Sequence, residues 1–236
     1  MKTPSRISAP AGLRERNRLD KLERIRAAAR KLFTERGFDR ATTRAIARRA
    51  NVGLGTLFNY AEDKRDLVFL VFIEELDRLT DRAFGAIDPR LAPIDQLLAA
   101  FGFFYREFGA NPTLSRILLR ELTFYSHGKL AGDFQRSRRR TVGFIARVVA
   151  RAQHDKRLRA DVDPHLTALS IFFLYSGAVR WWIARERPVA SVGIAGLRKL
   201  LALHLSGLEL AAVRAGHSGR ATRRIVQSPR MRSAFR

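Results

Sequence analysis

The chain has 236 residues, enough for one large domain or two modest ones, and 46% of them are hydrophobic, as expected of a folded globular protein. Its 45 Lys and Arg residues against 22 Asp and Glu give a net charge of +23, which predicts binding to a polyanion, either nucleic acid or an anionic membrane. Cysteine is absent, which excludes disulfides and thiolate metal sites and suits a reducing cytoplasm.

The N-terminus does not have the pattern of a targeting signal. Its first residues, MKTPSRISAPAGLRER, carry charge but no apolar segment. The longest mainly apolar stretch, 166–179, is followed by Arg180 and is shorter than the ~20 residues that a membrane-spanning helix needs. We therefore expect a cytoplasmic protein with no membrane partner.

The first predicted helix follows a basic arm. Residues 1–16 contain two prolines and a glycine, and we expect them to be flexible. From 16 to 36 the apolar residues recur on one face of a helical period, and Gly37 is placed to end that helix.

Two short helices and a tight turn come next. A helix over 43–50 is predicted with Thr42 as its N-cap, and Asn51 tolerates the left-handed conformation that a tight turn needs. A second short helix, 54–60, follows, and Asp63 is a suitable cap for a longer helix over 64–84.

The rest of the chain repeats the same capping signals. Prolines near the starts of segments 93–108, 112–125 and 164–185 predict three helices, because the missing N–H of proline does no harm at a first helical position. Gly128 precedes a basic helix ending near 153, and 192–215 forms the last. No segment alternates like a strand, so we predict an all-α protein of about nine helices.

The predicted organisation has four parts. A flexible arm, 1–16, precedes an N-terminal three-helix domain, 17–66, and a larger helical domain, 67–215. Residues 216–236 carry six arginines and no acid, lack periodicity and are expected to be disordered.

The two short helices have the spacing of a helix-turn-helix, whose second helix enters the DNA major groove. The stretch 50–61 carries no charge although its flanks are basic. Small side chains at Gly55 and Thr56 let bases approach, and Asn59 has the donor and acceptor pair that reads adenine. From the residues alone, the alternative interpretation is a helical hairpin that does not bind DNA.

Residues 29–67, ARKLFTERGFDRATTRAIARRANVGLGTLFNYAEDKRDL, resemble the TetR family of bacterial transcriptional repressors. The shared pattern is Gly-aromatic, Thr-Thr-x-x-Ile-Ala, Gly-Thr-Leu-aromatic-x-Tyr and Lys-x-x-Leu. The resemblance implies phosphate contacts from Thr43, Tyr60 and Lys64. It implies base or mixed contacts from Arg44, Leu54, Gly55, Thr56, Phe58 and Asn59. Leu57 would be core, packed on Ile46 and Val52.

Three residues depart from the family pattern. Phe58 replaces a usual tyrosine and loses its hydroxyl, and Gly53 replaces a common serine cap. Ala61 stands where phenylalanine is common and thins the packing beside the reading helix. These changes concern the operator contacts and leave the expected fold intact.

The resemblance implies that 17–66 is a helix-turn-helix DNA-binding domain and that 67–215 is a helical ligand-binding and dimerisation domain. The C-terminal two thirds are rich in aromatic residues, and the resemblance implies a small-molecule pocket there. Apolar, aromatic-lined cavities with a few polar groups are the usual ligand sites, although these aromatics can equally form core. The candidate ligand-binding residues are Phe101, Phe104, Tyr105, Phe108, Glu121, Phe124, Tyr125, His127, Phe173 and Arg180. No cofactor, metal site or catalytic motif is predicted, so we do not expect an enzyme.

The last two helices, about 164–185 and 192–215, are candidates for a homodimer contact. Ser170, Gly177 and Ala178 allow close helix approach, and 197–210 is apolar over most of its circumference. The alternative is an internal hairpin packed on its own domain.

We therefore expect a homodimeric repressor released from a palindromic double-stranded DNA operator by a small, apolar or aromatic effector. The helix 64–84 is the only covalent link between the halves and the expected transmitter. The alternatives are an activator or a nonspecific nucleoid-associated DNA binder of the same fold, or a helical carrier of lipids or small molecules.

Overall fold

The computed structural model describes residues 11–208, except for the side chains of Ala11 and Phe124. Within this range the elements are helical and no β-strand occurs, which confirms the all-α prediction. The helices are α1 (Ala11–Arg40), α2 (Thr43–Arg49), α3 (Leu54–Phe58), α4 (Lys64–Gly85), α5 (Pro93–Ala110), α6 (Pro112–Glu121), α7 (Ala131–His154), α8 (Pro164–Ile183) and α9 (Ala190–Ser206), with a 3-10 turn, η1 (Leu122–Phe124).

The predicted caps form as the sequence indicates. Thr42 accepts from the Ala45 N–H at 3.1 Å, and Asp63 accepts from the Asp66 N–H at 2.8 Å. Prolines occupy the first position of α5, α6 and α8. Gly37 has φ 74°, so it breaks the first helix at the predicted place, and three further residues continue beyond the kink.

The first helix begins earlier than expected. Residues 11–16, which we expected in the flexible arm, form the start of α1, so the prediction is wrong for them. This part of α1 is polar and has no apolar face, and it is stabilised along its surface by pairs such as Arg18 with Glu15. Hydrophobic periodicity therefore could not reveal it. The expected arm's other residues, 1–10, lie outside the described range.

The N-terminal helices α1 to α3 pack around a small core. Ile25 and Phe33 of α1, Ile46 of α2 and Leu57 of α3 are all fully buried. Leu57 thus has the predicted core position, which fixes α3 against the two other helices.

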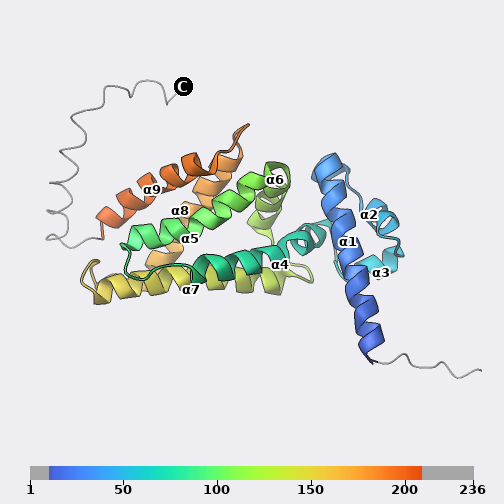
Figure 1. Ribbon diagram of the computed structural model, residues 1–236, viewed down its shortest axis with the longest axis horizontal. Coiled ribbons are helices and arrows are strands. Elements are labelled where there is room, and N and C mark those ends of the chain that lie inside the picture. Colours follow the sequence, from blue (N-terminus) through green and yellow to red (C-terminus); the bar gives the residue numbers. More distant parts are fainter. Residues whose placement is uncertain (1–10, 209–236) are drawn as a thin grey trace, which may run out of the picture.

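The helix α4 leaves this N-terminal group and runs into the larger helical body (Figure 1). There α4, α5 and α7 pack together, α8 packs on α7, and α9 packs on α5 and α8. The buried aromatic residues of α5 and α8 form the centre of this body, where Phe101 and Tyr175 stack at 4.1 Å between ring centroids.

The last two helices are shorter than predicted. The helix α8 ends at Ile183 and α9 spans 190–206, with Gly207 as its C-cap. The prediction that the last helix continues to 215 is thus wrong at 207 and 208, where the chain turns. There the Leu208 carbonyl accepts a hydrogen bond from the Arg159 N–H. Residues 209–236, including the expected disordered tail, lie outside the described range.

Candidate nucleic-acid interface and regulatory site

The turn between α2 and α3 has the geometry of a helix-turn-helix. Asn51 adopts φ 52°, the predicted left-handed conformation, and the Val52 N–H donates to the Ala47 carbonyl at 3.1 Å. Gly53 is the N-cap of α3 and supplies no side-chain hydrogen bond. The turn therefore aims α3 outward while Leu57 anchors it to the core.

None of the nine candidate DNA-binding residues is buried. Arg44, Gly55, Phe58 and Asn59 are exposed, and Thr43, Leu54, Thr56, Tyr60 and Lys64 are partly exposed. A Cβ added at Gly55 would meet no atom of the protein within 4 Å, so nothing inside the described chain requires glycine there. The helix α3 ends at Phe58, and Asn59 is its C-cap rather than an interior residue.

Two of the expected phosphate-binding residues already have partners in the protein. The Tyr60 hydroxyl donates to the Arg18 carbonyl at 3.1 Å. The Lys64 ammonium donates to the Asp39 carbonyl at 3.3 Å and lies 4.3 Å from the centre of the Phe38 ring. Both side chains hold α1 against the segment after α3, a role that the sequence did not reveal.

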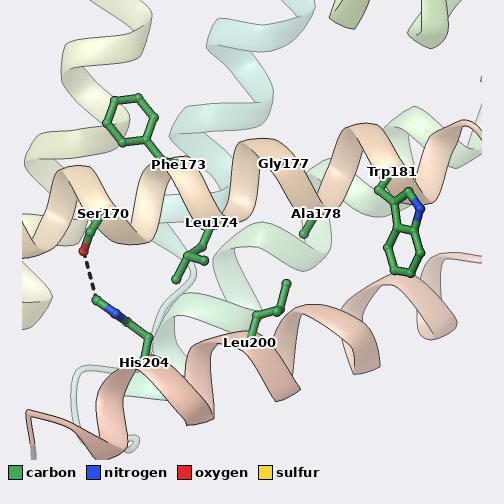
Figure 2. Close-up of a pocket in the computed structure, with 8 residues that line it drawn as sticks. All are labelled: Ser170, Phe173, Leu174, Gly177, Ala178, Trp181, Leu200 and His204. Carbon is green, nitrogen blue, oxygen red and sulfur yellow. Dashed lines mark hydrogen bonds between the residues drawn. The ribbon is translucent and has the colours of Figure 1, made fainter.

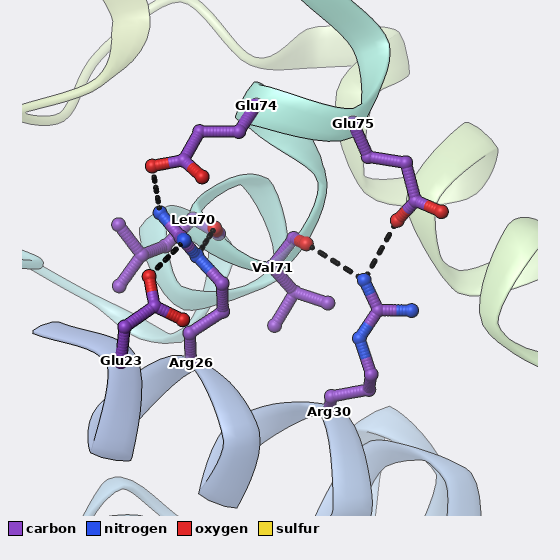
Figure 3. A network of polar contacts seen from close by, with 7 residues as sticks. All are labelled: Glu23, Arg26, Arg30, Leu70, Val71, Glu74 and Glu75. Atoms are coloured by element: carbon purple, nitrogen blue, oxygen red, sulfur yellow. Dashed lines mark hydrogen bonds and ion pairs between the residues drawn. The ribbon is translucent and has the colours of Figure 1, made fainter. Parts of the chain in front are cut away.

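Arginines of α1 fasten that helix to α4 (Figure 3). Arg26 donates to the Leu70 carbonyl at 3.0 Å and pairs with Glu74 at 2.8 Å. Arg30 donates to the Val71 carbonyl and pairs with Glu75 at 2.7 Å. Because charged donors satisfy both backbone and carboxylate groups of α4, the N-terminal helices and the first turns of α4 form one unit.

A buried carboxylate joins that unit to the larger helical body. Asp66, in the first turn of α4, is fully buried and accepts hydrogen bonds from the Tyr125 hydroxyl and from the backbone N–H of Glu62, Lys129 and Leu130. Three of these donors belong to the segment 125–130 between η1 and α7, which we name the junction loop. Four donors compensate the burial of this charge, so the junction loop is held to α4.

The junction loop needs glycine at position 128. Gly128 has φ 121°, and a Cβ there would lie 2.5 Å from an Asp66 carboxylate oxygen. Burial, followed by the hydrogen bond to Asp66, raises the pKa of Tyr125, so the phenol keeps the proton that it donates. The loop is therefore shaped around this carboxylate.

The junction loop also touches α3 directly. The Lys129 ammonium donates to the carbonyl of Phe58, the last residue of α3. Nearby, Arg65 of α4 pairs with Glu121 of α6 at 3.3 Å, so this candidate ligand residue binds a cation of the protein instead. The link between the two halves is thus not only the covalent one through α4 that the sequence indicated.

The candidate ligand residues fall into separate places. Phe101, Phe104, Tyr105 and Phe108 are core residues of α5, Tyr125 is buried at the junction loop, and His127, Phe173 and part of Arg180 are exposed. The side chain of Phe124 lies outside the described part. The buried hydroxyl of Tyr105 has no hydrogen-bond partner among the described residues. The four α5 aromatics thus pack against one another and against α8, with Tyr105 tilted on Trp182 at 4.7 Å.

Hollows occur at several places in the described part of the larger body. One, of about 680 Å³, lies between the start of α5 and the end of α9, where Arg198 pairs with Asp95. These two helix ends are distant from α3 (Figure 1). Another, of about 290 Å³, lies between η1, α7 and α8 and includes Phe173 and Arg180 among its walls. The second hollow therefore contains two of the candidate ligand residues and lies beside the junction loop.

The outer faces of α8 and α9 are apolar and form a groove (Figure 2). Its walls include Leu174, Ala178 and Trp181 from α8 and Leu200 from α9, and Ser170 hydrogen-bonds to His204 at 2.9 Å across it. Trp181 is 72% exposed. By length and composition α8 is also apolar enough to cross a membrane, although 39% of its apolar window is buried in the protein. Contiguous exposed apolar surface of this kind is typical of interaction sites.

Comparison with known proteins agrees with this geometry. Residues 25–71, which contain α2, α3 and the start of α4, match the family of bacterial regulatory proteins, tetR family. The HTH-type transcriptional regulator YhgD of Bacillus subtilis (strain 168), itself uncharacterized, is 26% identical over 77% of this chain and 94% of its own length. The regulator HbdR of Aromatoleum sp. (strain CIB) is 33% identical, over 34% of this chain and 35% of its own.

Solved structures of similar fold include two regulators named FadR. The Thermus thermophilus repressor, in complex with lauroyl-CoA, superposes with a TM-score of 0.63 at 23% identity, over 80% of this chain and 95% of its own. The Bacillus subtilis protein, in complex with stearoyl-CoA, superposes with a TM-score of 0.62 at 19% identity, over 79% of this chain and 99% of its own. At these identities the likeness concerns the fold. The family match over residues 25–71 and the shared fold agree, and the chain is similar to transcriptional regulators of the TetR family.

Proposed function

We propose that the protein is a homodimeric repressor that binds a near-palindromic operator through α3 and leaves it when a small effector with a large apolar part binds the helical body. The observation that carries the proposal is the exposed, uncharged surface of α3 between basic flanks, held out by the buried Leu57. Arginines such as Arg44, Arg48 and Arg49, all exposed on α2, supply salt-dependent attraction to phosphate.

The proposed contacts divide into two kinds. Gly55, Thr56 and Asn59 face base edges, and Thr43 with Arg44 approaches the backbone at the start of α2. Tyr60 and Lys64 contribute from positions that their bonds to Arg18 and Asp39 already fix, so little side-chain freedom is lost on binding DNA. Leu54 and Phe58 border the reading surface as apolar contacts.

The dimer is proposed to form through the apolar faces of α8 and α9. Trp181 is 72% exposed and Leu203 76%, and both lie on the outer surface of these helices. Two helices from each protomer would make a four-helix bundle and cover this surface. The two α3 helices would then lie about one turn of DNA (~34 Å) apart or somewhat more, in successive major grooves.

The effector is proposed to act through α4 and the junction loop together. Asp66 ties the loop to the first turn of α4, and Lys129 ties it to the end of α3. An effector that favours another arrangement of η1 would disturb both contacts and shift the population of protomers whose α3 helices fit the operator. Both FadR proteins bind fatty acyl thioesters, which is consistent with a regulatory body of this fold accommodating a large apolar group.

Selection of bound sequences from a random duplex library tests the function. The expected result is an enriched palindrome with half-sites about one helical turn apart, bound with a Kd far below that of a scrambled duplex at the same salt. Asn59→Ala should relax the preference at one base position and leave binding to the scrambled duplex unchanged. A flat selection would refute the repressor and favour a nonspecific DNA binder. Enrichment without any effect of apolar compounds would refute the effector response.

A further inference from the structure

The hollow between η1, α7 and α8 has an unusual distribution of charge. Its cavity is about 290 Å³, at the small end of the range for ligand pockets. The walls that matter are Thr123 from η1, Phe134 and Arg138 from α7, and Phe172, Phe173 and Arg180 from α8. Two cationic side chains therefore border one small, otherwise largely apolar space.

No carboxylate of the described chain pairs with either arginine. Two other arginines of α7 do form ion pairs, Arg136 with Asp133 and Arg140 with Asp77 of α4. Neither Arg138 nor Arg180 takes part in an ion pair within residues 11–208. Both arginines are only partly exposed. A cation withdrawn from water without a counterion is costly, so this arrangement favours an anion from outside.

Arg180 is held in position without being neutralised. Its Nε donates to the Thr123 hydroxyl at 3.3 Å and one Nη donates to the Ser176 carbonyl at 2.8 Å. Burial lowers the pKa of Arg180, and the nearby charge of Arg138 lowers it further, while Tyr175 opposes this. The two guanidinium groups thus lie within electrostatic reach and repel each other.

Arg138 faces the apolar walls. Its guanidinium carbon lies 5.3 Å from the centre of the Phe172 ring and 6.0 Å from that of Phe173. Cation–π contacts orient the guanidinium plane but leave its N–H donors available to an acceptor. One bound molecule can therefore contact both the phenylalanine rings and the guanidinium groups that border the hollow.

We propose that this hollow binds an amphipathic organic anion, whose carboxylate or phosphate group lies between Arg138 and Arg180 and whose apolar part lies against Phe134 and Phe172. Planar guanidinium groups suit such oxyanions because they donate two parallel hydrogen bonds. This assignment rests on the proposed effector response, and it narrows the effector from an apolar molecule to one that also carries a negative charge.

The position of the hollow explains how such an anion would act. Thr123, which Arg180 holds, belongs to η1, and the chain passes from η1 directly into Tyr125, the donor to Asp66. An anion that recruits Arg180 competes with its bond to Thr123 and so loosens η1. The signal then reaches α4 and α3 through the junction loop.

Phe173 and Gly177 line both this hollow and the α8–α9 groove. In the proposed dimer the partner subunit would lie next to the open side of the hollow. The test therefore uses the full-length dimer, and its oligomeric state is measured alongside binding.

A matched series of probes tests the proposal by calorimetry on the protein without DNA. Octanoate and octyl phosphate carry the anion, and 1-octanol and octylamine carry the same chain with no charge or a positive one. We expect both anions to bind at least tenfold more tightly than octanol, and Arg138→Gln or Arg180→Gln to remove at least tenfold of that affinity. Arg139→Gln, an equal charge change at an exposed position of α7, should bind like the wild type.

The outcomes separate this inference from the proposed function. Anion binding that depends on Arg138 and Arg180 supports the site even if no operator is found, which would refute the repressor alone. Octanol binding as tightly as octanoate overturns the anion site and leaves an apolar effector. Anion affinity that is equal in R138Q, R180Q and R139Q shows nonspecific attraction to a basic protein and also overturns it. Thermal unfolding of each variant confirms that it is folded.

Discussion

Gly55→Ala separates DNA binding from stability more sharply than any other change in α3. Gly55 is the second residue of α3, it is exposed, and an added Cβ would meet no protein atom within 4 Å. Alanine is favoured over glycine in a helix by roughly 0.5–1 kcal/mol, so the free protein should be slightly more stable. For a chain of this size the melting temperature should rise by at most about 4 °C.

The same methyl group should weaken operator binding. If the backbone at Gly55 lies against base edges, a methyl inserted into a close-packed contact costs roughly 1–3 kcal/mol, or about five- to 150-fold in Kd. Fluorescence anisotropy with the selected duplex and a scrambled one, at a single salt concentration, measures this loss. The scrambled duplex should bind nearly as before, because phosphate attraction is unchanged.

Gly85→Ala is the matched control. Gly85 is an exposed glycine with open space around it at the far end of α4, which is about 33 Å long at 1.5 Å per residue. It should alter stability by a similar amount and leave DNA binding unchanged. Full operator affinity in Gly55→Ala would refute the placement of α3 in the major groove.

Three further results are expected. Tyr125→Phe removes a donor from the buried Asp66 carboxylate, and it should lower the free energy of unfolding by about 1.5–3 kcal/mol and blunt effector-induced release; an unchanged denaturation midpoint would contradict the role of the junction loop. Glu107 lies on α5, and burial together with the neighbouring Glu75 carboxylate raises the pKa of Glu107 above its ordinary value of 4.5. Below pH 4.5 the protonated side chain contributes fully to the stability of the fold, and this contribution is lost as the pH rises through the raised pKa. Glu107→Gln should therefore melt above the wild type at neutral pH and converge with it in acid, and equal melting curves throughout would count against the repulsion between Glu107 and Glu75. Leu203→Glu on the exposed α9 surface should give a folded monomer with weak operator binding by light scattering and anisotropy, whereas an intact dimer would place the interface elsewhere.

The sequence alone determined the features that depend on local chemistry. Thr42 and Asp63 cap their helices, Asn51 takes the left-handed turn conformation and Leu57 enters the core, because caps, turns and helical periodicity act within a few residues. The proposed DNA-reading surface on α3 was inferred from the same short-range signals. The polar start of α1 was not predicted as helix, because it has no apolar face that hydrophobic periodicity could detect.

Only the tertiary structure decided the contacts between residues far apart in the chain. Asp66 and Tyr125 are 59 positions apart, and in the sequence Asp66 is one more acid in a helix-capping stretch. Arg138 stands in a run of arginines, and nothing in that run distinguishes it from Arg140, which finds Asp77 and Asp81 on α4. The aromatics of α5 were candidates for a pocket and became core. Partner choice among such groups depends on which helix faces pack together, and that is fixed by the whole fold and not by local sequence.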